Sequence, residues 1–101
     1  MSYTYWLHEK IQTDFNEGFA WYENKKKGLG FEFLNEIEGT INKIVAHPGS
    51  FGSKGNPLYR EALLKGFPYV IVYRIYSRKK EIFISALHHT SKSPRKKYRR
   101  P

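Results

Sequence analysis

Cysteine is absent from the 101-residue sequence. Its absence excludes a disulfide framework and a thiolate metal site, and it fits a protein that works in a reducing compartment. No apolar run approaches the roughly 20 residues that a membrane-spanning helix needs. The first residues also lack the charged start and the apolar stretch of a signal peptide. We therefore expect a soluble, cytoplasmic protein that has no membrane partner.

Acidic residues are scarce in the second half of the chain. Residues 1–47 hold 5 Lys/Arg and 7 Asp/Glu, a balance of −2, whereas residues 48–101 hold 13 Lys/Arg and 2 Asp/Glu, a balance of +11. The last ten residues alone contribute +6. This asymmetry favours a polyanionic partner, either nucleic acid or an acidic protein. The alternative is a solvated basic tail that only aids solubility.

Patterns typical of metal or phosphate sites are also lacking. The 4 histidines share no metal-ligand spacing, and the adjacent His88 and His89 point to opposite faces of an expected strand. The glycine-rich segment 49–55 lacks the Gly-Lys-Ser/Thr ending of a phosphate-binding loop, so we interpret it as a connector. We expect no metal, no organic cofactor and no small-molecule ligand.

Aromatic residues, in contrast, are abundant, at 17% of the chain. They bury a large area each, so one compact core is possible in a chain whose length predicts a single domain. Two apolar stripes at helical spacing predict two helices joined by the polar segment 25–30. The first stripe is Ile11, Phe15, Phe19 and Tyr22, and the second is Phe33, Leu34, Ile37, Ile41 and Ile44.

Short β-prone segments account for most of the remaining chain. Residues 3–7 predict a first strand, and residues 58–65, 69–76 and 81–88 predict three more after the helices. This β-α-α-β-β-β order predicts an α+β fold, with a helical hairpin on one face of an antiparallel four-stranded sheet. We expect one domain over residues 1–91 and a basic tail, too charged to join the core, over residues 92–101.

Alternation along the strands predicts what each face of the sheet carries. The set that we expect the helices to cover is Tyr69, Ile71, Tyr73 and Ile75. On the last strand Ser85 suits an apolar core poorly, so we place His89, four residues on, on the uncovered face with it. Arg60, Lys65 and Arg74 reach the same face if the strand register allows it.

Three segments follow one another in an order found in a known family. Trp21-Tyr22-Glu23 and Gly28-Leu29-Gly30 lie in the helical hairpin, Phe67-Pro68-Tyr69 leads into the central strand, and Ala86-Leu87-His88-His89 is followed by Pro94. Over about residues 3 to 94, this ordered set resembles the RelE/ParE toxins. The resemblance implies a cytoplasmic bacterial toxin of a type II toxin–antitoxin, or plasmid stabilisation, system. Its partner would be a co-expressed antitoxin, which the charge of this chain predicts to be acidic.

The resemblance also implies one of two targets. The Phe67-Pro68-Tyr69 turn and the His89-to-Pro94 spacing are more similar to the ParE-like members, which inhibit DNA gyrase and so arrest growth. The alternative is a RelE-like endoribonuclease that cuts mRNA in the ribosome, and a third is a degenerate, non-toxic member. Ser91 and Lys92 stand where the family often carries arginine, so neither side chain there offers a bidentate guanidinium.

Each target predicts its own functional residues. For a gyrase inhibitor, the target-binding candidates are the basic and aromatic side chains Arg60, Arg74, Lys92, Arg95 and Tyr98. For an endoribonuclease, His89 is the candidate for proton transfer and Lys65 supplies positive charge to the phosphate. An equally good interpretation of His89 is a strand-end histidine whose ring is satisfied by backbone or water.

Overall fold

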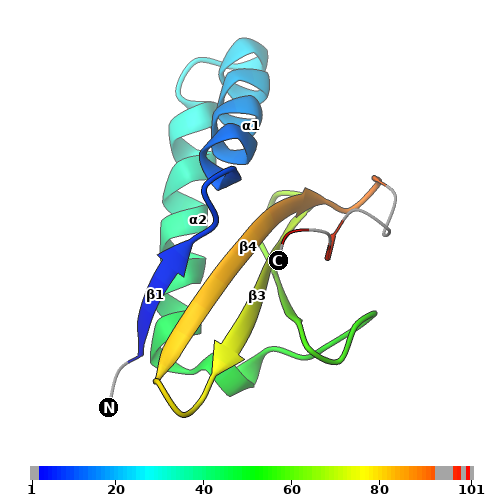
Figure 1. The fold of residues 1–101 in the computed structure, drawn as a ribbon. Helices are drawn as coiled ribbons and strands as arrows, with labels where there is room; N and C mark the ends of the chain where they lie inside the picture. The colour runs from blue at the N-terminus through cyan, green and yellow to red at the C-terminus, as the bar shows by residue number, and fades with distance from the viewer. Residues whose placement is uncertain (1–2, 93–96, 99, 101) are drawn as a thin grey trace.

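Two antiparallel helices lie along one face of a four-stranded sheet (Figure 1). The structure, a computed structural model, describes residues 3–92, 97–98 and 100. Its elements are β1 (Thr4–Leu7), α1 (Ile11–Lys25), α2 (Leu29–Ala46), the short 3₁₀ helix η1 (Pro48–Ser50), β2 (Arg60–Leu63), β3 (Tyr69–Tyr76) and β4 (Glu81–His89). Neither helix of this described part combines the length and apolar character that crossing a membrane requires.

The sheet is mixed, with strand order β1-β4-β3-β2. β2, β3 and β4 form an antiparallel meander as expected, but β1 pairs with β4 in parallel, from Thr4 opposite Glu81 to Leu7 opposite Ile84. The prediction of a wholly antiparallel sheet is therefore wrong at β1. The reason is the number of reversals: α1 and α2 carry the chain away and back, so β2 starts at the same end as β1, and two hairpins later β4 runs in that direction too.

Close approach of the two helices depends on glycine. A Cβ added at Gly18 of α1 would lie 2.4 Å from the ring of Phe33 on α2, so only glycine lets that ring pack against the α1 backbone. The start of α2 is tied to α1 as well, because the backbone N–H groups of Gly28 and Gly30 both donate to the Glu23 carboxylate at 2.9 Å. These contacts fix the hairpin as one unit.

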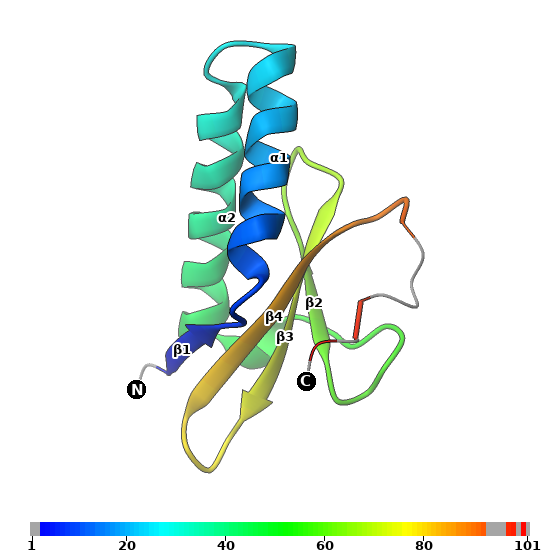
Figure 2. The ribbon, with the colours of Figure 1, turned by 45° about the horizontal axis from the view of Figure 1, so that its top comes forward.

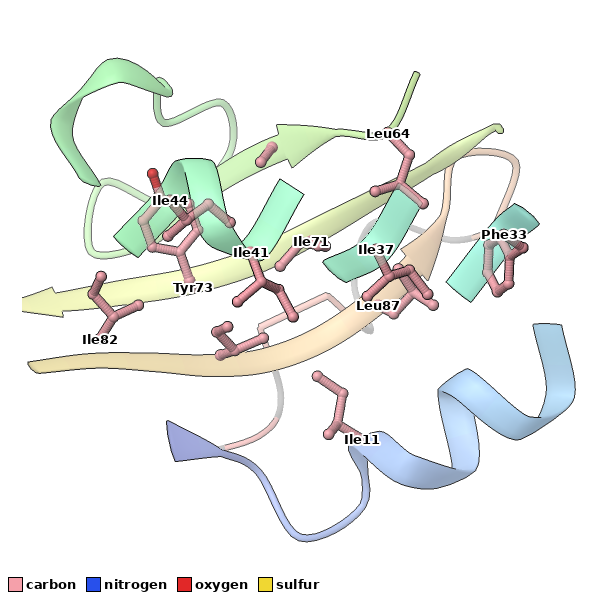
Figure 3. Packing of buried hydrophobic residues seen from close by; sticks show 12 residues of the cluster. Ile11, Phe33, Ile37, Ile41, Ile44, Leu64, Ile71, Tyr73, Ile82 and Leu87 are labelled. Atoms are coloured by element: carbon pink, nitrogen blue, oxygen red, sulfur yellow. The ribbon is translucent and has the colours of Figure 1, made fainter. Parts of the chain in front are cut away.

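The main core lies between α2 and the helix-covered face of the sheet, here the helix face (Figure 3). Its buried members are Ile11, Phe33, Ile37, Ile41, Ile44, Ala62, Leu64, Ile71, Tyr73, Ile82, Ile84 and Leu87. Tyr69 and Ile75 pack against this cluster from its margin. The predicted orientation of the central strand is therefore confirmed, and α2 supplies its apolar stripe at the expected spacing.

Among the twelve buried members of this main core, Tyr73 alone carries a hydroxyl group, and its ionisation predicts a pH dependence. The side chain is 0% exposed, and its hydroxyl donates to the Pro48 carbonyl at 2.6 Å. Burial raises the pKa of Tyr73 from 10.0 to about 12. The folded state thus holds this proton more tightly than the unfolded state, so the contribution is complete below pH 10 and lost as the pH rises to 12.

We expect ionisation of Tyr73 to lower the free energy of unfolding by about 3 kcal/mol as the pH rises from 10 to 12. Urea denaturation at steps across that range measures the loss. In Tyr73→Phe, which has no proton to release at this site, the decline should be shallower by that amount. Identical declines in the two proteins would show that Tyr73 is not the source.

A β-bulge in β4 changes which side chains face the helices. Val72 pairs with Ala86 and Tyr73 with Ile84, so Ser85 is an extra residue, and its buried hydroxyl donates to the Val72 carbonyl at 3.2 Å. One extra residue reverses the alternation beyond it. His89 consequently pairs with Tyr69 on the helix face. Our placement of His89 on the uncovered face is therefore wrong, and His88 takes that face instead.

Candidate functional site

The face of the sheet away from the helices, here the open face, carries a second apolar cluster with an arginine beside it. Tyr59, Val70, Val72 and Ala86 are buried together there. The guanidinium of Arg74 lies over two rings, 5.6 Å from the centre of Tyr59 and 5.0 Å from that of Tyr76. Stacking on aromatic faces fixes the plane of this cation and presents its charge on the open face.

The end of the chain returns to this face (Figure 2). Glu61 of β2 has a side chain only 1% exposed, and its carboxylate accepts from Lys97 Nζ at 3.1 Å and from the Tyr98 hydroxyl. The Tyr98 ring packs 5.2 Å from that of Tyr59. Burial, and then the hydrogen bond to Glu61, raise the pKa of Tyr98. The basic tail that we expected outside the core thus contacts the sheet at Lys97 and Tyr98, because a buried carboxylate on β2 pairs with it.

Asp14 and Arg100 together cover the free edge of β4. β1 pairs with β4 only as far as Ile84, so the backbone beyond it needs other partners. Asp14 of α1 accepts from the Leu87 N–H at 3.2 Å and from both guanidinium nitrogens of Arg100 at 2.6 and 3.0 Å. Arg100 also donates to the Ser85 carbonyl at 3.1 Å. This pair closes the edge where a further strand would otherwise lie.

Replacing Asp14 by alanine should loosen this edge. The Leu87 amide and Arg100 lose their shared acceptor, and hydrogen bonds to a charged group contribute about 1.5–3 kcal/mol each. We expect the Leu87 amide to exchange with solvent about tenfold faster or more, measured by hydrogen exchange with NMR. Glu17→Ala, one turn further along α1 and exposed, is the matched control and should leave that rate unchanged. Equal rates in both variants would contradict the assignment.

A cavity of about 180 Å³, here the α1–β4 cavity, opens beside this pair. It is lined by Asp14, Glu17, Gly18, Tyr69, Ala86, Leu87, His88, His89, Lys92 and Arg100. His88 is 7% exposed, its Nε2 lies 3.3 Å from the Lys92 carbonyl, and burial lowers its pKa. An imidazole held neutral between carboxylates and cations has the composition that proton transfer needs.

His89 lies on the other side of the same cavity. Its ring meets Tyr69 edge to face at 4.9 Å. Its Nδ1 accepts from the Ser91 N–H at 3.0 Å and lies 2.7 Å from the Ser91 hydroxyl. One ring nitrogen is therefore used by the turn that follows β4, which is the arrangement of a strand-end histidine.

Neither a protein-family model nor a curated protein matches the sequence. Among solved structures, the chromosomal ParDE TA system from P. aeruginosa matches with TM-score 0.74 and 18% identity, over 86% of this chain and 95% of that one. The intact E. coli RelBE toxin-antitoxin complex matches with TM-score 0.67 and 14% identity, over 89% and 99%. The isolated E. coli RelE toxin matches with TM-score 0.65 and 15% identity, over 91% and 88%.

The chain has the RelE/ParE toxin fold. On this fold the predicted target-binding residues fall into separate places. Arg74 and Tyr98 lie on the open face around Tyr59, whereas Lys92 lines the α1–β4 cavity. Arg60 donates to the carbonyls of Gly49 and Phe51 and so holds the loop before β2. Arg95 lies outside the described residues.

The two candidate catalytic residues also lie in different surroundings on the RelE/ParE toxin fold. Lys65 is exposed in the turn between β2 and β3, where its backbone N–H donates to Glu36 of α2 at 2.8 Å. His89 lies beside α1. Sequence reasoning did not select His88, Asp14 or Arg100 as site residues; Ser85, a polar residue inside an apolar strand, was the signal for the bulge that turns His88 to the open face. Within the described residues, no three His, Asp or Glu side chains form a group that could hold a metal ion.

Proposed function

We propose that this protein is the cytoplasmic toxin of a type II toxin–antitoxin pair and that it arrests growth by binding DNA gyrase through its open face. The observation that carries the proposal is Arg74, whose guanidinium is stacked over Tyr59 and Tyr76 on the open face. Arginine and tyrosine are enriched among the few residues that provide most of the binding energy of protein–protein interfaces. The match to the ParDE structure, at TM-score 0.74, supports the ParE-like choice.

The spacing of the candidate catalytic residues also favours binding over cleavage. Cutting RNA needs a base, an acid and a cation around one phosphate. Here His89 packs against Tyr69 beside α1, and Lys65 lies by Glu36 of α2. A toxin that blocks its target by occupying it has no need of such a set.

We place the acidic antitoxin in a groove on the helix side of this molecule. The groove, of about 610 Å³, runs between α1 and the end of β4 and is lined by Glu17, Ala20, Trp21, Asn24, Tyr69, His89, Ser91 and Lys92. Trp21 is 58% exposed, and tryptophan is enriched among the residues that contribute most to protein–protein binding. The chain's excess of positive charge predicts that the antitoxin's affinity falls with added salt.

Plasmid supercoiling by purified DNA gyrase tests the proposal. We expect the 101-residue chain to inhibit supercoiling in a dose-dependent way. Relaxation of the same plasmid by a type I topoisomerase is the control, because a basic protein that merely coats DNA inhibits both enzymes. Normal supercoiling at a large excess of folded protein, or equal inhibition of both enzymes, would count decisively against gyrase as the target.

The α1–β4 cavity favours a second candidate, the ribosome-dependent endoribonuclease. It places His88, whose pKa is lowered by burial, together with Asp14, Lys92 and Arg100. Primer extension on mRNA from induced cells would then show new 5′ ends that disappear in His88→Ala. Burial lowers the pKa of His88, so His88 stays neutral until the pH falls below the ordinary histidine value of 6.5. Cleavage of mRNA by the toxin on isolated ribosomes should therefore decline only below that pH. Intact messages would exclude this activity.

A further inference from the structure

Trp6 forms a flat, exposed surface on the open face, at the other end of β4 from the α1–β4 cavity. Its ring stacks on Phe83 with centres 4.1 Å apart and planes 27° apart, so it covers a side chain that is only 1% exposed. It is also close to parallel with Tyr76, at 6.4 Å and 22°. Trp6 itself remains 46% exposed. Trp6 is therefore held from beneath by Phe83 and lies close to parallel with Tyr76, whose ring carries the Arg74 guanidinium at 5.0 Å.

Cations border these rings along the free edge of β3. β2 pairs with β3 only from Val70 to Tyr73, so residues 74–76 extend past the end of β2. Two hollows lie there, one of about 280 Å³ lined by Arg60, Arg74 and Ser77 among others, and one of about 360 Å³ lined by Tyr76, Arg78 and Lys79 among others. Ile75 and Ser77 line both hollows, so the two hollows are neighbours. A single acid, Glu81, pairs opposite Tyr76 in the described register.

We infer that this surface, here the stacking strip (Trp6, Arg74, Tyr76, Arg78 and Lys79), binds an unpaired strand of nucleic acid. A base stacks on the exposed ring of Trp6, next to Tyr76 and the Arg74 guanidinium that lies over it, and the phosphates lie along the two hollows. Aromatic platforms beside a cationic groove are how proteins hold single strands without reading sequence. A duplex has no free base faces to offer, and an acidic peptide leaves the rings without a flat partner.

The inference goes beyond the proposed function, because gyrase is bound there as a protein and no nucleic acid is required. It assigns a second ligand to a part of the open face that neither the α1–β4 cavity nor the described tail residues occupy. Stacking and phosphate contacts do not depend on the 2′-OH, so DNA and RNA strands of the same length should bind alike.

Tryptophan fluorescence tests the inference directly, because Trp6 and Trp21 are the 2 tryptophans of the chain. In Trp21→Phe, Trp6 is the reporter, and we expect a single-stranded oligomer of roughly 12 nucleotides to quench it. In Trp6→Phe, the reporter is Trp21 at the far end of α1, and the same oligomer should leave it unquenched. Equal quenching in both variants, or equal affinity for a duplex of the same length, would overturn the inference.

Variants with little risk to folding provide the second measurement. Arg78→Ala/Lys79→Ala removes two exposed charges from the strip, and Lys26→Ala/Lys27→Ala removes two from the exposed turn between the helices. We expect the first pair to reduce the slope of log K against log salt by about 1.4, since each phosphate contact on a single strand contributes about 0.7. The control pair should leave the slope unchanged, and identical slopes would contradict the phosphate contacts.

Trp6→Leu keeps Phe83 covered but removes the flat ring, and it should weaken binding about tenfold. Trp21→Leu is its matched control and should bind as the unmodified chain does. Poly-glutamate should compete poorly at equal charge, because it cannot stack. Displacement by poly-glutamate as effective as by oligonucleotide would mean an ionic surface for acidic proteins instead. These assays contain no gyrase, so their failure and failure of the supercoiling test are separate results.

Discussion

Replacing Phe33 by alanine is expected to lower the free energy of unfolding by about 3–5 kcal/mol. The ring is 0% exposed and lies 5.0–5.2 Å from the rings of Tyr22, Phe67 and Tyr69. It also fills the space that Gly18 leaves between the helices, so its loss opens a cavity that the glycine backbone cannot close. The free energy of unfolding of natural domains is about 5–15 kcal/mol in total, so this substitution should remove a large part of the stability.

Urea denaturation followed by circular dichroism measures this loss. Phe31→Ala is the matched control, because Phe31 lies two residues away on α2, is 60% exposed and meets Phe19 edge to face at 5.0 Å. It should cost less than about 1 kcal/mol. Similar losses in the two variants would mean that the packing of the helical hairpin on the sheet is not what stabilises the fold.

Replacing Arg74 by alanine should weaken gyrase inhibition by about 30-fold, the loss typical of an interface residue whose truncation costs about 2 kcal/mol. The reason is that Arg74 is already ordered by Tyr59 and Tyr76, so little side-chain entropy is lost when it meets an acidic group. Arg74→Lys keeps the charge but not the planar guanidinium, so it should inhibit gyrase more strongly than Arg74→Ala and more weakly than the unmodified chain.

The dose that halves supercoiling is the measurement for these variants. Lys43→Ala is the control: it removes one exposed charge from α2, on the helix side, and should inhibit as the unmodified chain does. Thermal melts of each variant separate loss of contact from loss of fold. If Arg74→Ala, correctly folded, inhibits as well as the unmodified chain, the open face around Arg74 is not the gyrase-binding surface.

Most of the fold follows from periodicity that is visible in the sequence. The stripes ending at Tyr22 and Ile44 lie within α1 and α2, and the doubly apolar run 69–76 is β3 at the predicted bounds. The direction of β1 was missed because its partner, β4, is more than seventy residues away and no local pattern encodes that pairing. The sequence did offer the number of chain reversals through the helical hairpin and the two β-hairpins, and that number makes β1 and β4 run in the same direction.

The candidate site was less predictable because it depends on one inserted residue and on the chain's end. Ser85 was correctly recognised as misplaced in an apolar strand, but a bulge, not a polar face, is the structural reason. Glu61 carried a second signal: a carboxylate beside Ala62 in a buried strand needs a cation. Lys97 and the Tyr98 hydroxyl both donate to the Glu61 carboxylate. Lys97 is 36 residues from Glu61 in the sequence, and no spacing rule identifies such a pair.

Bacterial growth after induced expression tests most directly our proposal that this chain is a toxin. We predict that growth stops when the unmodified chain is induced, continues when Phe33→Ala is induced, and recovers when an acidic antitoxin partner is co-expressed. Cultures that grow at the rate of an empty vector, while the unmodified chain accumulates in a folded form, would contradict the account.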